Sequence, residues 1–165
     1  MVLIPIIVVM ILPFLIAYLR NRMFLKKKGN ILAMASESAI LLKNISGDVY
    51  IESSLYTRWL FFDKTEVLFD KSNVYLLPRK GIFGQKLPGI VQISLDKNNR
   101  YINKFSSLHL LLFEIKSERK YIKFMTKETE MSTKKSEVIL NFNNHSDKEV
   151  VLQYLSEWGF TLKSE

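Results

Sequence analysis

The first stretch of the chain constrains it most, because residues 2–19 contain eighteen consecutive residues without a charge. Five basic residues follow at once, namely Arg20, Arg22, Lys26, Lys27 and Lys28. A helix of that length spans about 27 Å, and the hydrocarbon core of a bilayer is roughly 30 Å thick. The sequence therefore predicts a transmembrane helix over residues 1–20.

Two other interpretations of this stretch are open. A cleaved signal peptide carries positive charge ahead of its apolar core and a small-residue cleavage site directly behind it. Here no basic side chain precedes the core, and the A-x-A motif at residues 33–35 lies beyond the whole basic cluster. A helix buried in a soluble domain would keep a polar face, which this stretch lacks. The favoured interpretation is an uncleaved, single-pass membrane helix.

The basic cluster predicts how such a helix would be oriented. Residues 21–35 are interpreted as a basic juxtamembrane linker, and the positive-inside rule places the remaining domain, residues 36–165, in the cytoplasm. Each basic side chain near an anionic bilayer surface contributes on the order of 1 kcal/mol of attraction. We expect the cluster to contact anionic lipid headgroups, or to serve only as the orientation signal.

Charge and cysteine content exclude several kinds of protein. The chain has 165 residues and a net charge of +8, and five of its 24 basic residues belong to the cluster after residue 19. The domain that follows is therefore nearly balanced, so the basic stripe of a nucleic-acid-binding protein is not expected. The absence of cysteine excludes disulfides, thiol catalysis and cysteine-ligated zinc.

From residue 39 onward the pattern favours strands. Short apolar or alternating runs, separated by turn residues, predict about seven strands. The eight runs from which they are drawn are residues 49–52, 59–62, 65–69, 74–77, 90–95, 108–115, 121–125 and 137–142. Turn residues at 70–73 join two of these runs into a predicted hairpin. In the last run we expect Val138, Leu140 and Phe142 to point inward.

The final segment changes to the period of a helix. Ser146 and Glu149 have the spacing of a capping box, which predicts that the helix begins there. Four apolar residues then recur at helical spacing and form one inner face: Val151, Tyr154, Leu155 and Trp158. Gly159 is placed to end the helix.

This order of elements resembles the pleckstrin-homology-like superfold, including its GRAM-like members. The resemblance covers residues 39–160 and is carried by the 65–77 hairpin and by the final helix with Trp158 on its inner face. It implies a curved, open antiparallel sheet of about seven strands, plugged by the C-terminal helix. Members of this superfold include phospholipid-binding and peptide-binding modules.

No pattern of catalytic, metal-binding or cofactor-binding residues is evident. The two histidines are expected to be ordinary residues, His109 in a strand and His145 in a turn. The glycines at positions 81 and 84 lack the spacing of a phosphate-binding loop. We therefore expect no catalytic residue, no metal and no cofactor.

One loop carries a possible lipid-contacting pattern. In residues 79–88, Arg79, Lys80 and Lys86 surround Phe83, and basic residues around an apolar tip suit contact with lipid headgroups. The alternative is an ordinary solvated connection. Residues 126–136 predict a polar surface loop, or a flap that contacts a partner.

These observations lead to two functional hypotheses. The first is a single-pass membrane protein that presents a non-enzymatic PH-like binding or scaffold domain at the inner membrane surface. There it would contact lipid or a membrane protein. The second is a small accessory subunit that associates with a larger membrane complex through its N-terminal helix. An enzyme and a nucleic-acid-binding protein are not expected.

Overall fold

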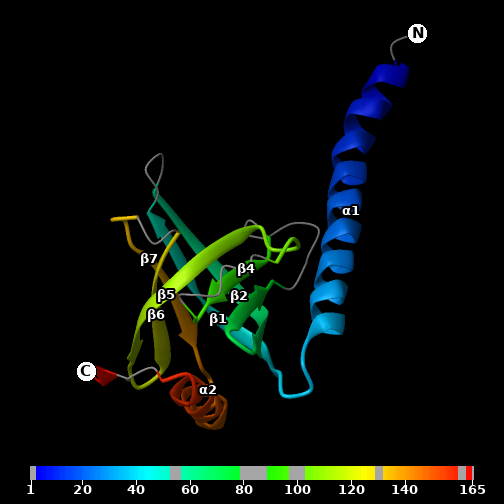
Figure 1. Ribbon diagram of the computed structural model, residues 1–165. Coiled ribbons are helices and arrows are strands. Elements are labelled where there is room, and N and C mark those ends of the chain that lie inside the picture. Colours follow the sequence, from blue (N-terminus) through cyan, green and yellow to red (C-terminus); the bar gives the residue numbers. More distant parts are fainter. Residues whose placement is uncertain are drawn as a thin grey trace.

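The computed structural model describes residues 3–52, 57–78, 89–96, 103–128, 132–159 and 163–164, with side chains described from residue 11 to residue 159. Two helices and eight strands lie within these ranges (Figure 1). In chain order they are α1 (Leu3–Met34), β1 (Ile40–Glu52), β2 (Thr57–Asp70), β3 (Asn73–Leu77), β4 (Val91–Ser94), β5 (Leu108–Ser117), β6 (Tyr121–Lys127), β7 (Ser136–Asn141), α2 (His145–Glu157) and β8 (Lys163–Ser164).

Seven of the strands form a closed barrel. The pairing order β4-β3-β2-β1-β7-β6-β5 is completed by a further pairing between β4 and β5, which joins the two ends of the sheet. This last pair is parallel, with Val91 opposite Leu108 and Ser94 opposite Leu111, whereas the other barrel pairs are antiparallel. The short strand β8 pairs with the far end of β5.

The predicted open, antiparallel sheet is wrong, because the parallel pairing of β4 with β5 closes the sheet. A parallel pair needs a long return connection, and residues 95–107 supply one between β4 and β5. Buried polar side chains hold its last part in place: Gln92 accepts a hydrogen bond from the backbone N–H of Asn103 at 2.8 Å. The sequence pattern predicted both strands but gave no signal for their pairing.

The main core fills the barrel with alternate strand residues, because successive side chains of a strand point to opposite faces. Val138 and Leu140 are fully buried and Phe142 is 7% exposed, which confirms the predicted inward face of β7. The predicted 65–77 hairpin is also confirmed, since Asp70 pairs with Asn73 across a two-residue turn.

Helix α2 lies at one end of the barrel (Figure 1) and contributes Val151, Tyr154 and Leu155 to the main core. Two details differ from expectation. The N-cap is Asn144, whose side chain accepts a hydrogen bond from the backbone N–H of Ser146, so the predicted capping box is wrong. Trp158 is the C-cap and is 41% exposed, not buried on the inner face.

Helix α1 packs its second half on the outside of the barrel. Phe24 and Ile31, two turns apart on one helix face, are buried in a second apolar cluster with Leu68, Tyr75, Leu77 and Ile90. Lys28, between them, forms an ion pair with Glu66 of β2 at 2.7 Å. The segment interpreted as a linker is therefore helical as far as Met34.

Within the described part of the chain, no helix has both the length and the apolar character needed to cross a membrane. The predicted transmembrane helix over residues 1–20, and with it the single-pass membrane interpretation, is therefore wrong. The prediction ended one element at Arg20, whereas α1 continues through the basic cluster and docks its later turns on the barrel. The predicted cytoplasmic location stays a prediction.

Gly47 marks a point where β1 passes very close to its neighbours. A Cβ at this position would lie 1.9 Å from the carbonyl oxygen of Ile139 and 2.7 Å from the ring of Phe62. We predict that Gly47→Ala lowers the free energy of unfolding by about 3 kcal/mol, because β1 and β7 must separate to admit the methyl group.

Gly29 supplies the matched control for this substitution. It lies inside α1, and its added Cβ would meet nothing within 4 Å. Gly29→Ala should raise the free energy of unfolding by about 0.5–1 kcal/mol, since alanine favours the helix. Urea unfolding measures both, and equal effects of the two substitutions would contradict the close approach of β1 to β7.

Candidate functional site

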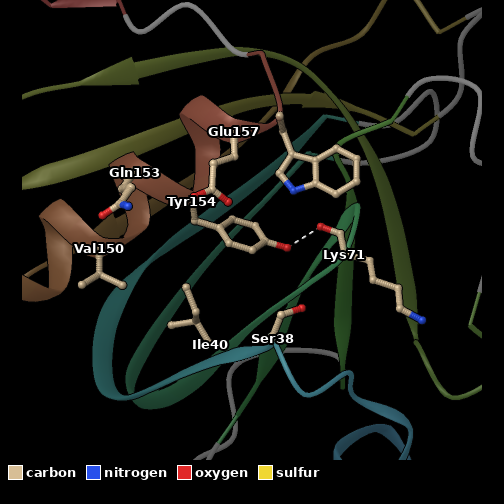
Figure 2. Close-up of a pocket in the computed structure, with 8 residues that line it drawn as sticks. Ser38, Ile40, Lys71, Val150, Gln153, Tyr154 and Glu157 are labelled. Atoms are coloured by element: carbon tan, nitrogen blue, oxygen red, sulfur yellow. Dashed lines mark hydrogen bonds between the residues drawn. The ribbon is translucent and has the colours of Figure 1, made fainter.

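A groove of about 670 Å³ lies between α2, the start of β1 and the β2–β3 turn (Figure 2). Its lining residues come from three separate parts of the chain: Ser38, Ile40, Lys71, Val150, Gln153, Tyr154, Glu157 and Trp158. Ligand sites commonly have volumes of 300–1,000 Å³, so the groove is of suitable size for a bound side chain or short segment.

Tyr154 fixes the floor of the groove. Its ring packs edge-on against Phe69 with a centroid separation of 5.5 Å, and its hydroxyl donates a hydrogen bond to the backbone carbonyl of Lys71. Figure 2 shows this bond crossing from α2 to the turn. Lys71 has a φ of 51°, so the two-residue turn holds its carbonyl toward the helix.

The opposite wall is held by Asp70. Its carboxylate accepts hydrogen bonds from the backbone N–H of Ser36, at 3.0 Å, and from the Ser36 hydroxyl. These bonds fasten the connection between α1 and β1 to the β2–β3 turn. Ser38 and Ile40, which follow directly, are thereby placed in the groove wall.

The groove surface combines apolar and charged groups. Val150 and Trp158 are each 41% exposed, and Ile40 is partly buried beside the main core. The exposed side chains of Lys71 and Glu157 bring one positive and one negative charge to the same site. This mixture suits a partner with an apolar side chain flanked by polar groups.

A stretch of β1 next to the groove has only one strand neighbour. Residues 40–42 and Ile45 pair with β2, with a register shift between Leu42 and Ile45, whereas the pairing of β1 with β7 begins at Ser46. Among the described residues, no strand lies along the other side of this stretch. An unpaired strand edge offers backbone N–H and C=O groups to an added strand.

Burial raises the pKa of the Tyr154 phenol to about 12, and the Asp70 and Glu157 carboxylates add to the rise while a hydrogen bond with Trp158 opposes it. A phenol with this pKa is neutral at physiological pH. It is therefore a hydrogen-bond donor in the groove and a poor general base.

Ser94 and His109 form the arrangement closest to a catalytic pair. The Ser94 oxygen lies 2.9 Å from Nε2 of His109, and burial lowers the pKa of that imidazole. However, Ser94 is only 1% exposed and donates its proton to Oδ1 of Asn73, an atom that can only accept. His109 then donates to Ser94 and cannot activate it, so this pair is a structural contact in β4 and β5.

Among the residues that the structure describes, no three His, Asp or Glu side chains lie close enough together to hold a metal ion. His145 lies at the start of α2, 80% exposed, with Nδ1 3.6 Å from the carboxylate of Glu149. The two histidines thus belong to different elements, β5 and α2.

The predicted lipid-contacting residues are not brought together with the groove. Arg20, Arg22 and Lys26 are exposed on α1, whereas Lys27 and Lys28 are half-buried. Arg79, Lys80, Phe83 and Lys86, together with the glycines at 81 and 84, lie outside the described residues. Contact of these side chains with anionic lipid headgroups stays a prediction.

Sequence reasoning singled out Tyr154 and Trp158 as a helix face but missed the groove. The groove wall opposite α2 comes from Ile40 and Lys71, which are far from α2 in the sequence. The only local signal was the turn at residues 70–73, whose role in holding Tyr154 depends on tertiary packing.

No protein-family model matches the chain, and a search of curated proteins found no match. The resemblance to the PH-like superfold therefore stays a prediction.

We predict that the native protein loses folding stability at alkaline pH through ionisation of the Tyr154 phenol, and that Tyr154→Phe removes this part of the loss. In the unfolded chain tyrosine ionises near its ordinary pKa of 10.0, whereas folded Tyr154 resists ionisation until about pH 12. The native protein therefore loses stability as pH rises through this window, and the variant lacks that part of the loss.

Urea unfolding of both proteins at pH 7, 10 and 12 measures this effect. At pH 7 the variant should be less stable by about 1 kcal/mol, because the bond to Lys71 is lost. The deficit should shrink toward pH 12. A deficit that stays constant over this range would show that the phenol is freely solvated.

Proposed function

We propose that this chain is a non-enzymatic binding module that holds an extended segment of a partner protein in the groove beside α2. The observation that carries the proposal is the position of the groove beside the unpaired stretch of β1. Strand addition to a sheet edge gives affinity through backbone hydrogen bonds, and adjacent pockets give specificity. Here the exposed surfaces of Val150 and Trp158 would receive an apolar side chain of the added segment.

The charges in the groove also favour a peptide segment as its ligand. Lys71 and Glu157 bring opposite charges to the groove, so a segment with one acidic and one basic side chain around an apolar residue would complement it. Such a ligand is short and amphiphilic, as peptide segments are. The neutral phenol of Tyr154 can orient it but cannot supply acid–base catalysis at neutral pH.

A display library of random ten-residue peptides, selected against the whole chain, tests this proposal. The chain has two tryptophans, so Trp59→Phe leaves Trp158 as the sole indole reporter. We expect the selected peptides to share an apolar residue between opposite charges and to shift the Trp158 emission. Selection of peptides that leave this emission unchanged would contradict the proposal.

Val150→Glu tests whether the selected peptides bind in the groove. Val150 is already partly exposed, so the substitution should leave the fold intact while placing a charge on the apolar wall. It should weaken the selected peptides at least tenfold. Glu149→Gln, at the neighbouring position outside the groove, is the control and should bind as the native chain does.

A second candidate function, that of an accessory subunit, is favoured by α1. In Figure 1 the first half of this helix extends away from the barrel. Seven of its large side chains are between 48% and 60% exposed: Ile11, Leu12, Phe14, Leu15, Ile16, Tyr18 and Leu19. A contiguous apolar surface of this kind marks an interaction site.

The charges on α1 favour a different protein as its partner over a second copy. Side-by-side parallel copies would place Arg20, Arg22 and Lys26 next to their own counterparts, and like charges at such a contact repel. A partner with an apolar helix followed by acidic residues would avoid this repulsion.

Co-purification in a mild, non-denaturing buffer tests the subunit function. The native chain should retain one partner in stoichiometric amount, and a variant with Ile11, Leu15 and Tyr18 changed to serine should lose it. The control is Lys64→Gln, since Lys64 is exposed on β2. A partner that the triple variant still retains would overturn this second function.

A further inference from the structure

Three aromatic side chains gather on the outer face of the β1–β2 hairpin. Tyr50 pairs with Trp59 across the strands, with ring centroids 5.2 Å apart, and Phe61 lies 6.2 Å from Trp59. Trp59 is 52% exposed and Phe61 is 53% exposed, whereas their strand neighbours Leu60 and Phe62 are buried in the barrel. Alternation along β2 therefore presents two large rings to the outside.

Asp48 lies within this aromatic face. It is opposite Phe61 on β2 and opposite Ile139 on β7, so its carboxylate has aromatic and aliphatic neighbours. Partial burial raises the pKa of Asp48. Among the described residues, no basic side chain forms an ion pair with it. A charged carboxylate in such surroundings is stabilised by a cation that another molecule supplies.

Two further carboxylates lie beside this face, while Lys123, in the same row as Asp48, is paired with Glu137 at 3.1 Å. Glu52 lies two positions beyond Tyr50 on the same side of β1, and its contact with Lys134 is long, at 3.8 Å, between two well-exposed side chains. Asp63 follows Phe61 on the outer side of β2. Although aromatic rings can stack on nucleic-acid bases, carboxylates at these positions would repel the phosphates.

We propose that Tyr50, Trp59, Phe61 and Asp48 form a binding face for arginine side chains of a partner protein. A planar guanidinium stacks on an indole ring and at the same time donates two hydrogen bonds to a carboxylate. Trp59 provides the ring and Asp48 the carboxylate. None of these residues lines the groove beside α2, so the face is a separate site.

A fluorescently labelled peptide of six arginines is the probe, and anisotropy measures its binding to the full chain. Its counterpart, with citrulline in place of arginine, has nearly the same shape without the charge. We expect the arginine peptide to bind and the citrulline peptide to bind at least fivefold more weakly. Equal binding of the two peptides would overturn the proposal.

Two substitutions locate the binding on this face. Trp59→Leu removes the ring, and Asp48→Asn removes the charge while keeping the size of the side chain. Each should weaken the arginine peptide by about fivefold or more, as expected for loss of a cation–π contact or its charged partner. If Trp59→Leu impairs folding, Asp48→Asn alone decides.

Glu149→Gln is the matched control for Asp48→Asn. It removes a carboxylate that is exposed on α2, an element that contributes no residue to this face. Binding of the arginine peptide should be unchanged. If Glu149→Gln weakens binding and the two changes on the β1–β2 face do not, the arginine site is elsewhere and the proposal is wrong.

Discussion

The parallel pair β4–β5 is the contact on which the rest of the structure depends. It joins the two ends of the sheet, so the inner faces of seven strands enclose one core. Burial of apolar surface contributes about 25 cal/mol per Å², and closure lets every strand contribute on its inner side. The buried bonds from Gln92 to Asn73 and Asn103 hold the returning segment against β4, so polar contacts support the pairing that the apolar core requires.

Closure also determines where binding surfaces can form. Inner side chains are committed to the core, so ligands must use the barrel end or its outer faces. At the end, α2 and the β2–β3 turn leave the groove around Tyr154. On one outer face α1 covers Leu68 and Tyr75, while on another the rings of Trp59 and Phe61 stay exposed. The candidate sites are therefore surfaces that the barrel and its two helices leave uncovered.

The sequence predicted the local features of this fold and missed the long-range ones. Alternation predicted the inward face of β7, turn residues predicted the turn at residues 70–73, and Gly159 predicted the end of α2, because each of these features depends on neighbouring residues. The apolar run before Arg20 does not by itself indicate that the helix continues, whereas Phe24 and Ile31 further along have the spacing of a docking face. Barrel closure depends on the pairing of Leu108 with a distant strand, and the groove depends on the contact of Lys71 with α2. No local sequence pattern predicts such long-range contacts.

The β4–β5 pairing can be measured directly by nuclear Overhauser effects between backbone protons of the two strands. The closed barrel predicts cross-strand contacts in the rows Val91–Leu108 and Ile93–Leu110, together with slow amide exchange in β4. Slow exchange is expected because the strand has a partner on both sides. Absence of these contacts, with β4 amides that exchange as rapidly as those of a free edge, would contradict the closed barrel.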